Sequence, residues 1–177
     1  VLFMKNLLII FASPFTNLKL SEEIKDFFVS KDNISPTIIN LEELDLPLYT
    51  PSLESKFNEN KNFPKNIEKI KDILLHSHAI VWCSPEYNGG ISPIVTNMIA
   101  WISRATVDWK EAFKEKKNLI CSSSGGNGKN FVTGFRKQLE YLGSEVFEDS
   151  IIRTKKTDIN KDAFNQILSD FYSEINN

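Results

Sequence analysis

Four short runs of almost unbroken apolar residues constrain the fold of this chain more than any other feature of its sequence. They occupy residues 6–11, 37–41, 78–83 and 118–122. A strand with one face in water alternates apolar and polar residues, whereas a strand of a parallel sheet is covered on both faces and is apolar throughout. The runs therefore predict a buried parallel sheet, and residues 145–152 are predicted to add a fifth strand.

The segments between these runs space their apolar residues as amphipathic helices do. This spacing links Leu20, Ile24, Phe27 and Phe28 in the first segment, and Ile67, Ile70, Ile73 and Leu74 in the second. Further helices are predicted at residues 94–103, 131–142 and 163–175. Strands that alternate with helices are typical of a doubly wound α/β fold, so residues 1–177 are predicted to form a single domain.

Two stretches do not follow this alternation. Residues 42–64 are rich in Pro, Asn, Ser and Lys, and we predict that they form a long irregular loop, which in a compact domain is commonly functional. The charged residues at 110–117 are predicted to form a solvated loop or helical turn.

Composition and charge exclude several classes of protein. Hydrophobic residues make up 41% of the 177 positions and charged residues 25%, as in a globular domain. A formal net charge of −2 offers no basic field for nucleic acid. The longest apolar stretch, residues 7–12, is far shorter than the roughly 18 residues that suggest a membrane span. We therefore expect neither a nucleic-acid partner nor a membrane span.

The two cysteines indicate a reducing compartment. Cys83 and Cys121 lie far apart, without CxxC spacing or nearby histidines. This arrangement argues against a disulfide scaffold, a zinc site and a thioredoxin-type motif. We therefore predict two small buried thiols, no metal site and a cytoplasmic location.

Three predicted loops qualify as a binding site. Ligands of open parallel sheets bind outside the carboxyl ends of the strands, where the strand order reverses. Loop one (residues 13–17), loop two (residues 84–90) and loop three (residues 122–128) follow such strands and are rich in small or hydrogen-bonding residues. Loop one precedes a helix whose free N–H groups suit a phosphate, although Thr16 or Asn17 could simply cap that helix. The P-loop and GxGxxG patterns are absent, which disfavours P-loop kinases and Rossmann dehydrogenases.

Loop two carries a specific resemblance. Its proline, aromatic, amide and glycine residues can bring backbone groups against a flat heterocycle. The segment Pro-Glu-Tyr-Asn-Gly-Gly-Ile-Ser-Pro at 85–93, continuing through Asn97 to Trp101-Ile-Ser-Arg104, resembles the signature of the NAD(P)H-dependent FMN reductase family. The resemblance extends over nearly the whole chain. It implies a flavodoxin-like three-layer α/β/α sandwich with five parallel strands in the order 2-1-3-4-5.

The same resemblance implies FMN as the cofactor and assigns residues to it. One group of residues would receive the FMN phosphate, a second would line the isoalloxazine, largely through the backbone, and a third would close its other side. These groups are, in turn, Ser13, Thr16 and Asn17; Pro85, Glu86, Tyr87, Asn88 and Gly89; and Ser123, Ser124, Gly125 and Gly126. The chain departs from the family pattern in loop one, which is shorter and lacks the usual arginine, and at Ala100, where the family usually has an acidic residue.

The implied function is that of an NAD(P)H-dependent FMN oxidoreductase. Hydride would pass from NADPH or NADH through FMN to free flavin, a quinone, an azo compound or a similar acceptor, with ping-pong kinetics. Because the cofactor performs the chemistry, no catalytic acid, base or nucleophile is expected. The alternatives are a non-enzymatic flavodoxin-like electron carrier and a flavin-binding sensor. Family members usually complete the flavin cleft from a second subunit, so a homodimer or homotetramer is expected.

Several residues outside the loops have structural interpretations. His76 and His78 have no carboxylate or cysteine at ligand spacing and are given no catalytic role. Trp101 and Trp109 are interpreted as packing or interface residues. For Arg104 three interpretations remain open, namely a partner subunit, the phosphates of the nicotinamide nucleotide, and a solvated surface.

Overall fold

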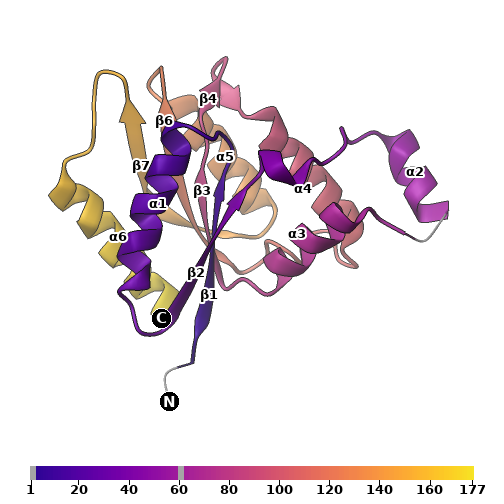
Figure 1. Cartoon of the computed structure of the whole chain (residues 1–177), viewed down its shortest axis with the longest axis horizontal. Coiled ribbons are helices and arrows are strands. Elements are labelled where there is room, and N and C mark those ends of the chain that lie inside the picture. Colours follow the sequence, from indigo (N-terminus) through magenta and orange to yellow (C-terminus); the bar gives the residue numbers. More distant parts are fainter. Residues whose placement is uncertain (1–2, 60–61) are drawn as a thin grey trace.

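Five parallel strands form the centre of the protein in a computed structural model that describes residues 3–59 and 62–177 (Figure 1). In spatial order they are β2 (Ile34–Asn40), β1 (Lys5–Phe11), β3 (Ala79–Cys83), β6 (Lys117–Ser124) and β7 (Glu145–Thr154). Counted along the chain, this is the predicted order 2-1-3-4-5, and every neighbouring pair is parallel. The predicted five-stranded parallel sheet is confirmed.

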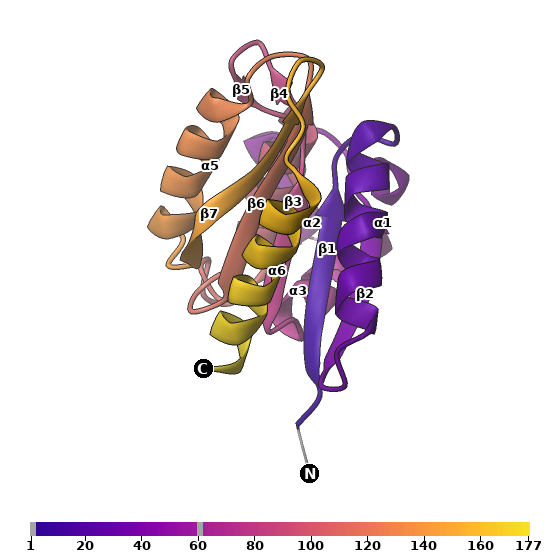
Figure 2. The ribbon, with the colours of Figure 1, turned by 90° about the vertical axis from the view of Figure 1, so that its left-hand side faces the viewer.

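Helices cover both faces of this sheet and so make three layers. One face packs against α1 (Thr16–Val29) and α6 (Lys161–Asn176). The other packs against α3 (Lys65–Leu75), α4 (Pro93–Ala105) and α5 (Lys129–Tyr141). Figure 2 shows α5 and α1 on opposite sides of the sheet. None of the described helices is long and apolar enough to cross a membrane.

The apolar runs of the sequence supply both layers of the core. Along β1, Leu8 and Ile10 face the layer of α3 and α4, whereas Leu7 and Ile9 face α1 and α6. Each of these four side chains is at most 1% exposed. Successive side chains of a strand point to opposite faces, so a run without polar interruptions is what a sheet covered on both faces requires.

The prediction that residues 42–64 form one irregular loop is wrong. A 3-10 turn spans Glu42–Leu44, and a helix, α2, spans Pro51–Glu59. Pro51 occupies the first position of α2, where a missing N–H removes no helical hydrogen bond. Apart from Pro51, only Leu53 and Phe57 are apolar in α2, and none of its side chains is buried, so the sequence has too few apolar positions to reveal this short helix.

A small hairpin inside loop two was also missed. β4 (Glu86–Tyr87) pairs antiparallel with β5 (Gly90–Ile91) across a two-residue turn. The turn residues Asn88 and Gly89 have φ values of 51° and 71°. Positive φ at both central residues is the conformation for which Asn-Gly is favoured in tight hairpins, because its twist matches that of the strands.

The charged segment 110–117 is only partly solvated, which corrects the prediction of a solvated loop. Ala112 and Phe113 are fully buried, and Lys116 is only 9% exposed. The Lys116 ammonium donates hydrogen bonds to the carbonyls of Leu75 and Ser77 at the end of α3. Burial lowers the pKa of Lys116, since desolvation disfavours its charged form.

Candidate flavin site at the carboxyl edge of the sheet

The three predicted loops lie at one edge of the sheet. β1, β3 and β6 are adjacent and parallel, so the loops that follow them emerge side by side. The ladder continues past the strands, where the Ala12 N–H donates to the Cys83 carbonyl at 3.0 Å and the Ser84 N–H donates to the Cys121 carbonyl at 3.1 Å. The sheet therefore sets the relative positions of the three loops independently of the contacts between their side chains.

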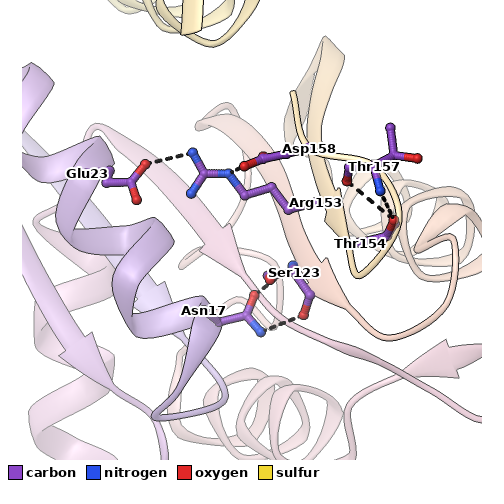
Figure 3. A network of polar contacts seen from close by, with 7 residues as sticks. All are labelled: Asn17, Glu23, Ser123, Arg153, Thr154, Thr157 and Asp158. Atoms are coloured by element: carbon purple, nitrogen blue, oxygen red, sulfur yellow. Dashed lines mark hydrogen bonds and ion pairs between the residues drawn. The ribbon is translucent and has the colours of Figure 1, made fainter. Parts of the chain in front are cut away.

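Asn17 joins loop one to loop three. Its Nδ2 donates to the Ser123 carbonyl at 2.9 Å, and its Oδ1 accepts from the Ser123 N–H at 2.9 Å (Figure 3). The side chain is only 1% exposed. Both ends of the amide are thus paired with the backbone of one residue, an arrangement that aligns the start of α1 with loop three.

The start of α1 is open to an anion. No side chain caps this helix, so the alternative in which Thr16 or Asn17 simply caps it is not what the structure shows. No acidic residue lies in its first turn. Uncapped N–H groups and the positive end of the helix dipole attract negative charge. Ser13 is 8% exposed and Thr16 is exposed beside these groups.

Glu86 joins loop two to loop three, a role that sequence reasoning missed. Its N–H donates to Ser124 Oγ at 2.7 Å, and its Oε2 accepts from the Phe131 N–H at 3.0 Å. Phe131 lies in the first turn of α5, so a carboxylate from loop two satisfies a free donor of that helix and faces its positive end. Ser124 Oγ also lies 2.9 Å from Ser122 Oγ. A cap from outside the helix leaves no sequence signal.

Loop two presents its tip to solvent. Pro85 is buried, whereas Tyr87, Asn88 and Gly89 are exposed, Tyr87 by 48%. Asn88 and Gly89 both adopt left-handed backbone conformations at this tip, as a tight hairpin turn requires. An exposed hairpin with an aromatic ring can support a flat heterocycle by backbone and ring contact. The direct flavin contacts assigned to these residues remain predictions.

The family-like residues of α4 hold the segment that contains α2. Asn97 Oδ1 accepts from the Tyr49 N–H at 2.7 Å, and its Nδ2 donates to the Pro47 carbonyl at 3.0 Å. Trp101 Nε1 donates to the same carbonyl at 2.6 Å. The Trp101 ring is fully buried and contacts the rings of Tyr49, Phe57 and Phe63. The interpretation of Trp101 as a packing residue is confirmed.

Arg104 is exposed and is also paired within the chain, and its roles toward a partner subunit or the nucleotide phosphates stay predictions. Its Nε lies 3.4 Å from Glu54 Oε2 and donates to the Tyr49 hydroxyl at 3.4 Å. The Tyr49 hydroxyl in turn donates to Glu54 Oε2 at 2.6 Å. The hydrogen bond to Tyr49 and the charge of Glu54 raise the pKa of Arg104. The guanidinium therefore helps to fix α2 against α4.

The two cysteines are buried neighbours in the sheet. Cys83 and Cys121 are register partners on β3 and β6, and both are buried and free. Burial and the hydrogen bond with Cys121 raise the pKa of the Cys83 thiol, so it is protonated at neutral pH. Their interpretation as small buried thiols is confirmed. Among residues 3–59 and 62–177, no group of three metal-binding side chains comes together.

The histidines lie away from the loops. His78 immediately precedes β3, and its Nδ1 accepts from the Asn6 N–H at 2.9 Å. Burial, together with the charges of Lys116 and Lys5, lowers the pKa of His78. The ring of His76 lies 2.7 Å from the Asp72 carbonyl. Both histidines therefore stand at the amino end of β3, opposite the candidate site.

Comparison with known proteins agrees with this geometry. The sequence model of the NADPH-dependent FMN reductase family matches residues 5–157. An NADPH:quinone oxidoreductase of Arabidopsis thaliana is 30% identical over 112 residues, which cover 63% of this chain and 52% of the relative. A quinone reductase of Escherichia coli (strain K12) is 27% identical over 63% of this chain and 53% of its own length. The chain thus spans about half the length of these two relatives.

Solved structures show the same fold at low sequence identity. The flavoenzyme NAD(P)H:(acceptor) oxidoreductase FerB from Paracoccus denitrificans superposes with a TM-score of 0.76 and 16% identity, covering 98% of this chain and 96% of that one. A flavodoxin from the domain Archaea gives a TM-score of 0.64, 16% identity and coverage of 97% and 99%. The arrangement of strands and helices is therefore flavodoxin-like.

Proposed function

The chain belongs to the NADPH-dependent FMN reductase family, and we propose that it passes hydride from NADPH or NADH through FMN to a quinone, free flavin, azo compound or similar small acceptor. One observation carries the proposal. Asn17 and Glu86 hold the three loops at the carboxyl edge of β1, β3 and β6 in one assembly, beside an uncapped helix start. This is the edge at which doubly wound sheets bind their ligands.

The donor set fits a flavin phosphate and ring. The phosphate would lie against Ser13, Thr16 and the N–H groups of the first turn of α1, where the missing arginine leaves backbone donors and the helix dipole as the main attraction. The ring would lie along 85–89 and against 123–126. Because Asn17 and the Glu86 N–H already have protein partners, their role in this proposal is to position the loops.

The protein contributes binding and orientation. When bound, FMN supplies the centre that accepts and donates hydride. The chain supplies a rigid hairpin at 86–91 and backbone donors of loop three, and preorganised donors favour charge that develops during the reaction. We propose that donor and acceptor use the exposed side of this site in turn, which predicts ping-pong kinetics. Initial-rate patterns that intersect would contradict that order.

We further propose that the active form is a homodimer or homotetramer. The support is a surface formed by α2 and the segment before it, where α2 buries none of its side chains and Leu48 is 76% exposed. A second subunit seated there would cover apolar surface that is otherwise exposed to water. Sedimentation velocity of the purified protein measures the oligomeric state directly, and a monomer at micromolar concentration would refute this proposal.

We also propose a cytoplasmic location, because free thiols such as Cys83 and Cys121 persist in a reducing compartment.

An anaerobic titration tests the main proposal. FMN is added to the purified protein, NADPH and then NADH are titrated, and loss of the visible flavin absorption is followed. Rapid bleaching that reverses on adding a quinone is the expected result. Tight FMN binding without bleaching would favour an electron carrier or a flavin-binding sensor instead. Absence of FMN binding would show that loop one without its arginine does not hold the phosphate.

A further inference from the structure

Glu86 brings a carboxylate between loop two and loop three without a cation to neutralise it. Its Oε2 accepts from the Phe131 N–H at 3.0 Å, and its Oε1 lies 3.8 Å from the position that a Cβ on Gly126 would take. Among residues 3–59 and 62–177, no lysine, arginine or histidine forms an ion pair with Glu86. Its negative charge is therefore held against loop three and faces the start of α5 rather than a cation.

Hydrogen bonds at both ends of Glu86 fix the place of this carboxylate. The Glu86 N–H donates to Ser124 Oγ at 2.7 Å, and Ser124 Oγ lies 2.9 Å from the hydroxyl of Ser122, which is fully buried. At the other end, the carboxylate accepts from the first turn of α5 through the Phe131 N–H. Because the backbone and the side chain of Glu86 are tied to different elements, the carboxylate cannot swing into solvent without breaking a hydrogen bond.

The carboxylate lies where the two loops assigned to the flavin ring meet. Residues 85–89 of loop two and 123–126 of loop three were assigned to the ring, and Glu86 connects these two sets through Ser124 and beside Gly126. It also occupies a free N–H at the start of α5, whose positive end adjoins loop three. The carboxylate thus adds negative charge beside the proposed ring site and offsets the positive end of α5 there.

A negative charge at this place acts on the redox balance of a bound flavin. A flavin gains electrons and, at neutral pH, negative charge on reduction, so a neighbouring carboxylate disfavours its reduced form. Glu86 is partly buried, and salt screens such a charge much less than an exposed one. Lys155 approaches loop three at Gly125 but is exposed, so solvent screens its opposite charge more. The net effect of Glu86 is therefore to lower the reduction potential.

We propose that the Glu86 carboxylate lowers the reduction potential of bound FMN and so sets the balance between the two halves of the reaction. The inference rests on the proposed function, because it concerns the flavin of that same site. A lower potential makes the reduced flavin a stronger donor to the acceptor and makes its reduction by NADPH or NADH less favourable. Glu86 itself exchanges no electron or proton, so it is a positioning residue that holds a charge in place.

The midpoint potential of the FMN-loaded protein tests the inference without a nicotinamide donor. It is measured by reduction with dithionite against a reference dye. Glu86→Gln removes the charge but keeps an oxygen for the Phe131 N–H. We expect this variant to favour reduced over oxidised FMN about tenfold more than the natural protein does, which raises the potential by about 30 mV for a two-electron couple. The matched control is Glu140→Gln, which removes the same charge from an exposed position in the last turn of α5 and should leave the potential unchanged.

Glu86→Asp separates the charge from the hydrogen bond, because it keeps the carboxylate on a shorter side chain. Its potential should stay closer to that of the natural protein than to that of Glu86→Gln. A shift as large as that of Glu86→Gln would assign the effect to the lost contact with Phe131 and would overturn the inference.

Rapid-mixing rates of the two half-reactions give a second readout. In Glu86→Gln, reduction of the flavin by NADPH should become faster and its reoxidation by a quinone slower, whereas a merely loosened loop would slow both. An unchanged potential in Glu86→Gln, or an equal shift in Glu140→Gln, would overturn the inference. A shifted potential in a protein that neither NADPH nor NADH reduces would retain the role of Glu86 and refute the proposed reductase.

Discussion

Removing the Asn17 amide is the sharpest test of how the site is built. Asn17→Ala deletes two hydrogen bonds of 2.9 Å to the Ser123 backbone, at a position that is 1% exposed. A hydrogen bond contributes about 1 kcal/mol net, and a buried group left without a partner costs about 1–3 kcal/mol. The free energy of unfolding should therefore fall by about 2–4 kcal/mol, a large part of the roughly 5–15 kcal/mol typical of a domain.

The same substitution should weaken FMN binding, because loop three loses its alignment with α1. We expect the Kd for FMN, followed by quenching of flavin fluorescence, to rise about tenfold, which corresponds to about 1.4 kcal/mol. Urea denaturation followed by tryptophan fluorescence measures the stability of the same samples. Binding is measured at a temperature where both proteins are fully folded, so that loss of affinity is separated from loss of fold.

Asn33→Ala is a matched control. Asn33 is also a buried asparagine, 4% exposed, with its Nδ2 donating to Asn176 at 2.6 Å and its Oδ1 accepting from Tyr172 at 2.7 Å. It lies immediately before β2, at the opposite end of the sheet from the loops. Its loss should lower stability by a similar amount and leave the Kd for FMN unchanged. If Asn17→Ala weakens FMN binding no more than Asn33→Ala does, or lowers stability by less than about 0.5 kcal/mol, the hydrogen bonds between Asn17 and Ser123 are not what aligns the loops.

Further substitutions test three other parts of the argument. Glu86→Ala should lower the free energy of unfolding by about 1 kcal/mol through loss of the α5 cap. Glu86→Gln should lower it by less, because the amide oxygen can still accept the hydrogen bond from the Phe131 N–H. Equal stability of the natural protein and both variants in urea would contradict the cap. Gly128→Ala should lower stability by about 1 kcal/mol or more, because φ is +69° and the added Cβ would lie 3.1 Å from a side chain. Gly134→Ala, inside α5 with open space around it, should instead stabilise the protein by roughly 0.5–1 kcal/mol. A Gly128→Ala variant with unchanged thermal unfolding would refute the backbone strain. Burial lowers the pKa of Lys116 in the folded protein below its ordinary 10.5. Between the folded-state pKa and 10.5 the unfolded chain binds more protons, so the free energy of unfolding should rise with pH relative to that of Lys116→Met. A difference in unfolding free energy that is independent of pH up to 10.5 would contradict the burial.

Much of the fold was readable from the chain. The unbroken apolar runs predicted strands covered on both faces, and this prediction held because each position of such a strand faces a helical layer. Helical spacing located α1, α3, α5 and α6 because each buries one apolar stripe. The pattern failed for α2, which buries no side chain, and for Lys116, whose charge predicted solvent exposure. Apolar periodicity indicates which side chains are buried. It therefore cannot locate a helix that buries no side chain, and it gives the wrong prediction where a charged side chain is buried.

The sequence by itself determined which residues stand at the carboxyl ends of the strands, because the strand pattern and the residues that follow each strand are local information. Only the tertiary structure decided what several of these residues do. Asn17 pairs with Ser123, 106 positions away, and Glu86 caps α5 through Phe131, 45 positions away. Likewise, the turn that follows β7 at 154–157 lies beside loop three, because β6 and β7 are neighbours in the sheet. Contacts between residues so distant along the chain depend on how the sheet orders its strands, and no local pattern encodes them.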